Sequence, residues 1–439
     1  MRTDFRSPYP RYCGLRAINA FASKLPLINV PSSSVRMSSS GMEVYPYCVH
    51  TPHLTNASRI VWPGSAVVWE RSSLPSSTEP YSTTYSSLKS NASTGEWLYS
   101  SFVSLAAELT PGPTGSDVSD NIMGYIEFKD LGILNTHLIT IGRGSHFTVS
   151  ALSDELEESS LVKVVFKRTV PQARLQSDQV FRTRIEAMML ELRALAHEPI
   201  QKHENIVNIQ GITWETDPFT IERHWPVFII ERATRGTLQD FFQQEAEICL
   251  PLRLELALDV IAGLEVIHAC GIVHGDLKLE NVLVFENKGL DAGKRPFIAK
   301  LADFGGSLFD IGTSARLKTP TQPWSAPEFQ KNLDPQALQL TDIYSLGLLL
   351  WRIFTGGKHP FAKLILLHPN ESTWLKEVST LKNDNEKMHA HLLNPETFGT
   401  KKELELASKV VLSLVQLDAS KRDLGLAKAV VQDAALGSR

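Results

Sequence analysis

The order of the hydrophobic patterns from about residue 134 onward constrains the fold more than any other feature of this sequence. Short runs of β-branched and aliphatic residues come first, and long stretches with helical periodicity follow. The strand-like runs are 138–141, 162–166 and 227–230, and the helical stretches are 252–268 and 342–354. Strands followed by helices predict an α+β fold in which a small β-rich lobe precedes a larger helical lobe.

The N-terminal region, residues 1–130, has a different composition. It is rich in Ser, Thr, Pro and Tyr, and its short apolar pieces show no sustained periodicity. A chain of this composition gains too little free energy from apolar burial to offset the conformational entropy that is lost on ordering. We therefore expect this region to be largely disordered. Its Arg- and Ser-rich start, in which Asp4 is the only acid before Glu43, resembles a mitochondrial transit peptide weakly.

Charge and cysteine content exclude several classes of protein. The formal net charge of −4 argues against a nucleic-acid binder that acts through a global positive field. Four widely spaced cysteines form neither a disulfide framework nor a zinc ribbon, and they suit a reducing compartment. No stretch approaches the ~20 apolar residues of a membrane helix, so we expect no membrane span. We therefore expect a cytoplasmic or nuclear protein, with mitochondrial import as the alternative. The sequence leaves its oligomeric state open.

The strongest chemical signal lies between a predicted helix and an apolar run. Asp276 is followed by Lys278 two residues later and by Asn281 five residues later. A carboxylate at this position can accept a hydroxyl proton, the ammonium can stabilise phosphoryl charge, and the amide can hold a metal ion. Asp303, in the tripeptide 303–305 (Asp-Phe-Gly), follows a strand-like run and supplies a second candidate ligand for Mg²⁺.

These motifs resemble those of the eukaryotic protein kinase family, and further motifs follow in the family's order. The triplet 326–328 (Ala-Pro-Glu) is similar to the one that closes the activation segment. Asp342 resembles the aspartate that braces the backbone of the family's catalytic loop, which corresponds to residues 274–281 here. His274 and Phe304 stand at positions of the stacked spine that joins the two lobes in this family. Arg422 stands where the family places an arginine that pairs with the glutamate of the triplet.

The resemblance covers residues 134–436 and implies a two-lobed fold. The N-lobe is expected at about 134–232 and the C-lobe at about 236–436, with ATP and Mg²⁺ bound between them. In this reading Asp276 and Lys278 are catalytic.

The glycine-rich loop of the family has a less regular counterpart here. Gly142 and Gly144 would let the backbone approach the phosphates, and Phe147 stands in place of the usual third glycine. By the same resemblance, Val149 would cover the adenine and Lys167 would contact the α- and β-phosphates.

A glutamate from the next helix is implied as the partner of Lys167. Glu191 has the leucine four residues later that the family pattern requires, and Glu186 is the alternative. The resemblance implies adenine contacts from Leu283 and from Glu231 and Ala233 of the hinge, residues 231–233. It implies a ribose contact from Asp240. Asp240 can equally be interpreted as an exposed carboxylate at the start of a helix.

Two residues favour Ser or Thr of protein substrates as the phosphate acceptor. Lys278 stands where tyrosine kinases of the family carry a different arrangement, and Thr321 matches a threonine that links the substrate loop to the catalytic loop.

One alternative to an active protein kinase is a pseudokinase that acts as a scaffold or allosteric partner, which Phe147 and Gly275 would favour. The other is a small-molecule phosphotransferase, which shares the His-Gly-Asp tripeptide but typically has a histidine at the position of Lys278.

Gly275 precedes the catalytic aspartate, where many relatives carry an arginine. That arginine receives a phosphorylated activation loop, so its loss predicts weak dependence on phosphorylation of Thr313, Ser314 or Thr319.

Overall fold

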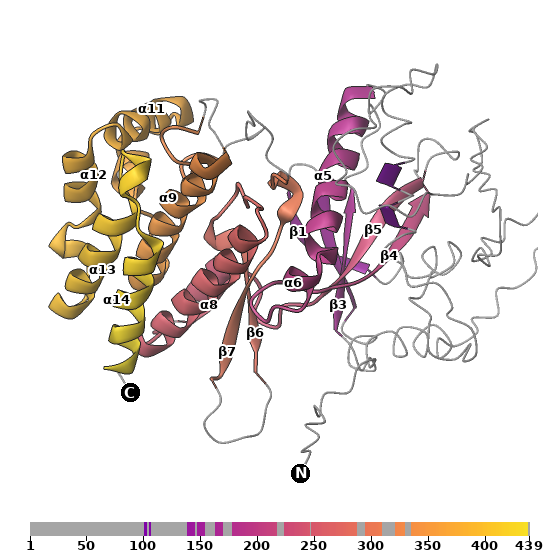
Figure 1. Cartoon of the computed structure of the whole chain (residues 1–439), viewed down its shortest axis with the longest axis horizontal. Helices are drawn as coiled ribbons and strands as arrows, with labels where there is room; N and C mark the ends of the chain where they lie inside the picture. Colours follow the sequence, from indigo (N-terminus) through magenta and orange to yellow (C-terminus); the bar gives the residue numbers. More distant parts are fainter. Residues whose placement is uncertain are drawn as a thin grey trace, which may run out of the picture. The chain divides into compact units, whose positions relative to one another are not determined.

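The computed structural model describes residues 101–102, 105–106, 138–144, 147–153, 163–169, 178–216, 224–245, 247–287, 295–309, 321–329 and 335–437. The chain divides into two compact units: Met1–Arg182 with Gln210–Arg232, and Thr183–Ile209 with Ala233–Arg439. The first unit contains a β-sheet and the second is mainly helical (Figure 1). This confirms the predicted α+β fold class.

The sheet of the first unit has five strands in the order β1-β2-β3-β5-β4. The pairs β1–β2, β2–β3 and β3–β5 are antiparallel. One face carries a small apolar core of Leu152, Val164, Phe166, Val227 and Ile229. The strands are β1 (Leu138–Arg143), β2 (Phe147–Leu152), β3 (Val164–Thr169), β4 (Ile209–Thr216) and β5 (His224–Glu231).

A short part of the N-terminal region packs onto this unit. Residues 101–102 and 105–106 are helical, and the Phe102 side chain is 0% exposed. Its ring lies edge-on to Trp214, at 5.9 Å between centroids, and stacks on Phe228 at 6.2 Å. The other residues of 1–130 lie outside the described residues, and their expected disorder stays a prediction.

The second unit combines a helical core with a two-stranded sheet. The strands β6 (Val282–Glu286) and β7 (Phe297–Leu301) pair antiparallel. Most of this unit's helices follow β7 in the sequence (Figure 1). The longer ones are α5 (Asp178–Ala196), which begins in the first unit, α8 (Leu250–Ala269), α9 (Pro335–Phe354), α11 (Glu371–Lys382), α13 (Lys401–Leu414) and α14 (Leu424–Leu436). The shorter ones are α6 (Glu198–Gln201), α7 (Leu238–Gln244), α10 (Ala362–Leu367) and α12 (Asn385–Leu392).

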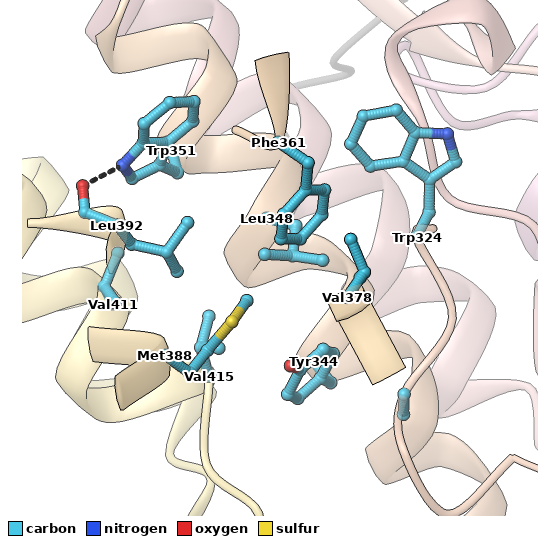
Figure 2. Close-up of a cluster of buried hydrophobic side chains, with 11 residues drawn as sticks. Trp324, Tyr344, Leu348, Trp351, Phe361, Val378, Met388, Leu392, Val411 and Val415 are labelled. Carbon is cyan, nitrogen blue, oxygen red and sulfur yellow. Dashed lines mark hydrogen bonds between the residues drawn. The ribbon is translucent and has the colours of Figure 1, made fainter. Parts of the chain in front are cut away.

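The main apolar cluster lies among α9, α11, α12 and α13 (Figure 2). Tyr344, Leu348 and Trp351 of α9 form one side, and the Trp351 indole N–H donates to the Leu392 carbonyl oxygen at 2.7 Å. Trp324 joins this cluster from the segment that precedes α9. The cluster therefore anchors the end of the predicted activation segment, which closes at residues 326–328, to the helical core.

Helix α8 delivers the chain to the predicted catalytic loop. It is apolar on nearly every side and ends where Gly271 adopts φ of 71°, a left-handed conformation that glycine adopts readily. The Ile272 N–H then donates to the Ile267 carbonyl oxygen at 3.1 Å, which closes the helix end. Among the described residues, no helix has the length and apolar character that crossing a membrane would require.

Candidate active site

The backbone before Asp276 is held by the carboxylate of Asp342 in α9. Oδ2 of Asp342 accepts the His274 N–H at 2.7 Å, and Oδ1 accepts the Gly275 N–H at 2.9 Å. His268 Nε2, from α8, lies 3.0 Å from the same Oδ2. Gly275 has φ of 78°, which a side chain would make costly. The structure thus shows the loop-bracing contact that the resemblance implied for Asp342.

The imidazole of His274 joins this loop to the segment of Asp303. Its Nδ1 accepts the Asp276 N–H at 3.3 Å, so Nε2 carries the proton that it donates to the Ala302 carbonyl oxygen at 3.1 Å. The ring centroid lies 5.1 Å from that of Phe304, and both side chains are 0% exposed. The contact expected between His274 and Phe304 is therefore present.

The two carboxylate oxygens of Asp276 have different surroundings. Oδ2 accepts the Lys278 ammonium at 2.6 Å and the Asn281 amide at 2.8 Å. Oδ1 is buried and has no hydrogen-bond partner in the part of the chain that the structure describes. A buried oxygen without a donor is costly unless a ligand supplies one. The described residues therefore leave one oxygen of this fixed carboxylate without a hydrogen-bond donor.

Asn281 and Asp303 supply oxygen atoms of the type that Mg²⁺ prefers. The Asn281 Nδ2 donates to both the carbonyl oxygen and Oδ2 of Asp276, each at 2.8 Å, so Oδ1 is the atom left for a cation. The Asn281 carbonyl oxygen accepts the Ala302 N–H at 2.9 Å, which ties this residue to the one before Asp303. Asp303 has φ of 64°, a conformation that is uncommon outside glycine and often marks functional sites. Both residues fit the metal that the resemblance implies.

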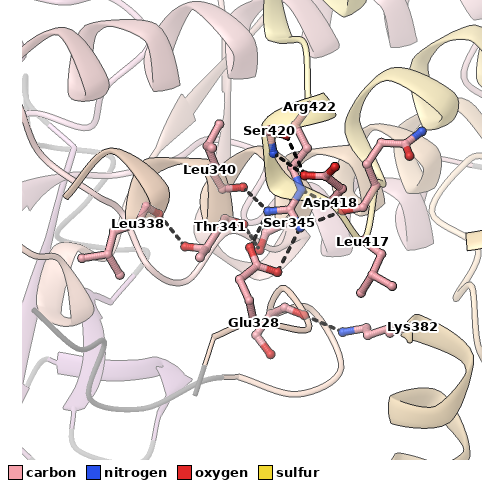
Figure 3. A network of polar contacts seen from close by, with 12 residues as sticks. Glu328, Leu338, Leu340, Thr341, Ser345, Lys382, Leu417, Asp418, Ser420 and Arg422 are labelled. Atoms are coloured by element: carbon pink, nitrogen blue, oxygen red, sulfur yellow. Dashed lines mark hydrogen bonds and ion pairs between the residues drawn. The ribbon is translucent and has the colours of Figure 1, made fainter. Parts of the chain in front are cut away.

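The predicted pair of Glu328 and Arg422 is present and bidentate (Figure 3). Arg422 Nη2 donates to Glu328 Oε2 at 2.9 Å, and Nη1 donates to Oε1. The remaining N–H groups of the guanidinium reach the carbonyl oxygens of Gln416 and Leu340. Every N–H of this buried guanidinium is thereby bound, as a buried charge requires.

The predicted phosphate-contacting residues of the first unit lie in β1, directly after it, and in β3. Gly142 faces Val149 across β1 and β2, and the Gly144 N–H donates to the Phe147 carbonyl oxygen at 2.8 Å. Val149 in turn faces Lys167 of β3. The Lys167 ammonium lies 5.0 Å from the centroid of the Phe147 ring. The residue that replaces the usual third glycine thus contacts the predicted phosphate-binding lysine.

Helix α5 carries the two candidate partners of Lys167. Glu191 is 1% exposed, whereas Glu186 is half-buried. A carboxylate is rarely so buried without a charged or hydrogen-bonding partner, so burial favours Glu191. Its pairing with Lys167 stays a prediction.

Apart from Val149 of β2, the predicted adenine and ribose contacts lie at the end of β5 and in the segments after it. Glu231 is the last residue of β5, and Ala233 begins the connection to α7. Leu283, in β6, is half-buried and bridges to Thr237. The carboxylate Oδ2 of Asp240 accepts the N–H and the hydroxyl of Thr237, at 3.1 and 2.7 Å. Asp240 thus forms a capping box for α7, which matches the helix-start reading of this residue, and its contact with ribose stays a prediction.

Lys382 and Arg352 contact residues 323–325 and were not predicted from the sequence. The Lys382 ammonium donates to two carbonyl oxygens of this segment, and the Arg352 guanidinium lies 4.7 Å from the Trp324 ring. Both residues stand in helical patterns where a cation usually faces solvent. No signal in the sequence indicated their burial.

Comparison with known proteins agrees with this geometry. Residues 136–431 match the family model described as protein kinase domain. The megakaryocyte-associated tyrosine-protein kinase of Rattus norvegicus is 28% identical over 173 residues, which cover 39% of this chain and 33% of that protein. The serine/threonine-protein kinase/endoribonuclease IRE1b of Arabidopsis thaliana is 35% identical over 155 residues, covering 33% of this chain and 17% of the relative. The receptor-interacting serine/threonine-protein kinase 1 of Homo sapiens is 26% identical over 170 residues, covering 37% and 24%.

These relatives include both tyrosine and serine/threonine kinases, so they do not decide the acceptor. The chain spans between 15% and 33% of the length of the curated relatives considered. The family model, in contrast, matches well over half of the chain, with the braced loop, the Asp-Phe-Gly tripeptide and the Glu328–Arg422 pair inside it. The chain belongs to the eukaryotic protein kinase family.

Proposed function

We propose that this protein is an active serine/threonine kinase, which transfers the γ-phosphate of Mg·ATP to hydroxyl groups of protein substrates. The observation that carries the proposal is the surroundings of Asp276. One carboxylate oxygen is fixed by Lys278 and Asn281, and the other is buried with no hydrogen-bond donor among the described residues.

Asp276 would orient the acceptor hydroxyl and accept its proton at Oδ1. The bonds from Lys278 and Asn281 to Oδ2 prevent rotation of the carboxylate, so the hydroxyl would be held in one direction. The Lys278 ammonium, 2.6 Å from Asp276, would stabilise negative charge on the phosphoryl group as it moves to the acceptor.

Asn281 and Asp303 would hold Mg²⁺, which neutralises charge on the ATP phosphates when it is bound. Gly142, Gly144 and Lys167 would contact the phosphates, with Glu191 as the partner of Lys167. Val149, Leu283 and the hinge residues Glu231 and Ala233 would contact the adenine.

The acceptor class rests on Lys278 and Thr321. The Thr321 carbonyl oxygen accepts the N–H groups of Trp324 and Ser325, at 2.9 and 3.3 Å, so this threonine begins a turn in the segment 321–329. A hydrogen bond from the Thr321 hydroxyl to the catalytic loop would favour Ser and Thr side chains as phosphate acceptors.

The alternative is a catalytically weak pseudokinase that acts as a scaffold or allosteric partner. Phe147 supports it, because its ring lies over Lys167 where the family has a glycine. Against it stand five residues of the phosphoryl-transfer motifs that the chain retains, which are Lys167, Asp276, Lys278, Asn281 and Asp303.

The experiment is transfer of labelled phosphate from Mg·ATP to a generic basic protein, followed by phosphoamino-acid analysis. Wild type is compared with Asp276→Ala and Lys167→Met, and with Lys163→Met as a control at an exposed lysine nearby. We expect phosphoserine or phosphothreonine from wild type and the control, and a loss of at least about 100-fold in both test variants.

Phosphotyrosine as the main product would refute the acceptor assignment but not the transfer mechanism. Nucleotide binding without transfer to any of a panel of proteins would favour the pseudokinase.

A further inference from the structure

Lys382 is a lysine buried in the second unit, at the end of α11. It is 4% exposed, and lysine is almost never this buried without partners. Its ammonium donates to the carbonyl oxygen of Ser325 at 2.6 Å and to that of Pro323. Neither acceptor is a carboxylate, so its first partners are backbone groups of the segment that closes at Glu328 (Figure 3).

Three successive carbonyl oxygens of this segment accept hydrogen bonds from helical side chains. Lys382 of α11 binds the first and the third, at Pro323 and Ser325. The Ser345 hydroxyl of α9 binds the one between them, at Trp324, over 3.1 Å. Backbone that is bound in this way by two helices has little freedom to rearrange.

An aromatic ring and a carboxylate also act on the Lys382 ammonium. It lies 5.6 Å from the centroid of the Tyr344 ring, which the Arg422 guanidinium also contacts at 5.0 Å. Burial lowers the pKa of Lys382 to about 7, and Glu328 opposes that shift. The Trp324 ring, whose carbonyl group lies between the two that Lys382 binds, contacts Arg352 and His359.

We propose that Lys382 is a positioning residue, which holds residues 321–328 in the conformation that receives the protein substrate. The proposal rests on the proposed kinase function, and it also explains how that segment can be ordered without phosphorylation. In relatives with an arginine before the catalytic aspartate, a phosphate on the activation loop does this. Here that position is Gly275, and the contacts of Lys382 and Ser345 are built into the fold.

The direct test is hydrogen exchange of the amides in residues 321–329, measured on the full chain. Lys382→Met removes the ammonium but keeps most of the alkyl volume. The control is Lys376→Met, the same change at an exposed position of the same helix. We expect exchange in this segment to rise about tenfold in Lys382→Met and to stay at the wild-type rate in the control. Equal exchange in all three proteins would overturn the proposal.

Should Lys382→Met unfold globally, exchange would rise throughout α9 and α13 as well. Lys382→Gln, which keeps a donor for one of the two carbonyl groups, then replaces it. An intermediate rate in residues 321–329 is expected, and a wild-type rate would again overturn the proposal.

Steady-state kinetics separates this role from a general structural one. We expect Lys382→Met to raise the KM for the protein substrate about tenfold while the KM for ATP stays unchanged. A uniform fall in kcat with both KM values unchanged would contradict positioning. If wild type transfers no phosphate, the proposed function fails, but the exchange measurement still decides whether Lys382 orders the segment.

Phosphorylation is tested in the same assay with a Thr313→Ala, Ser314→Ala, Thr319→Ala triple variant. These residues lie outside the described residues. Activity within about twofold of wild type is expected if Lys382 orders the segment without phosphorylation. Loss of most activity would show that phosphate, not the lysine, sets the receiving conformation.

Discussion

The buried guanidinium of Arg422 is one of the charged side chains on which the second unit depends. Arg422 makes two bonds to Glu328 and three to backbone carbonyl oxygens, and its side chain is 0% exposed. Glu328 is itself buried, so removal of the arginine would leave a carboxylate without its main partner.

Arg422→Met should therefore lower the free energy of unfolding by about 3–5 kcal/mol. The matched control is Lys421→Met, because Lys421 is the preceding residue and its side chain is 69% exposed. The control should change the free energy by less than about 0.5 kcal/mol. Urea denaturation followed by tryptophan fluorescence measures both. A cost for Arg422→Met no larger than that of the control would contradict this account of the pair.

His359 makes stability depend on pH. Burial, with the neighbouring Arg352 charge, lowers the pKa of His359 from its usual 6.5 to about 4. In the unfolded chain the imidazole therefore binds a proton at higher pH than in the folded protein. The free energy of unfolding should fall as pH drops from 6.5 to 4, and this contribution should be constant above that window.

The measurement is urea denaturation of wild type and His359→Asn across pH 4–6.5. Asparagine keeps an acceptor for the Phe361 N–H, which His359 Nδ1 binds at 3.2 Å, but it does not titrate. Wild type should lose more stability than the variant on acidification. Parallel curves would mean that His359 is not the group responsible.

At the scale of elements, close packing of α9 against α13 depends on Gly347. A Cβ at this position would lie 2.6 Å from Val415 Cγ2 and 2.9 Å from Leu414 Cβ. Neither neighbour can move freely, because both belong to the buried core.

Gly347→Ala should destabilise the protein by about 1–3 kcal/mol, because the added methyl group overpacks this contact. Gly425, in the first turn of α14, is the control, since a Cβ there meets only the Asp423 Oδ1 at 3.4 Å. Gly425→Ala should be neutral or stabilising by up to about 1 kcal/mol, as alanine favours helix. Chemical denaturation measures the free energy of unfolding of both variants. Changes of the same sign and size in the two would refute the packing argument.

Helical periodicity predicted α8 and α9 but not the whole of α9. The prediction began at Asp342, whereas the helix begins at Pro335. Proline suits the first turn of a helix, but the polar residues around it gave no apolar stripe on which to extend the pattern. Motif order, by contrast, placed Asn281 and Asp342 at the catalytic loop with Asp276, and the structure shows the contacts of both with this loop.

At the scale of the whole molecule, the catalytic domain includes a contact from the N-terminal region. Phe102 is 0% exposed against Trp214 and Phe228, although composition predicted disorder for residues 1–130. Composition averages over many residues, so it does not reveal a single aromatic anchor. For the same reason it did not reveal Lys382, whose burial depends on residues far away in the sequence.

Phe102→Ala should lower the free energy of unfolding by about 3–5 kcal/mol. A chain that begins at residue 134 should be destabilised by a similar amount relative to one that begins at residue 96. Thermal unfolding of the two shortened chains and the variant tests this. Equal melting temperatures for the two shortened chains would show that Phe102 contributes nothing to the fold.

The central claim is that Asp276 performs phosphoryl transfer, and one comparison tests it most directly. The rate of phosphate transfer from Mg·ATP is measured for wild type, for Asp276→Asn and for Asp433→Asn, an exposed aspartate of α14 that serves as the control. Asp276→Asn keeps the size of the side chain but weakens the proton acceptor, so kcat should fall by about 100- to 10,000-fold. Asp433→Asn should equal wild type. Transfer by Asp276→Asn at the wild-type rate would contradict the proposed mechanism.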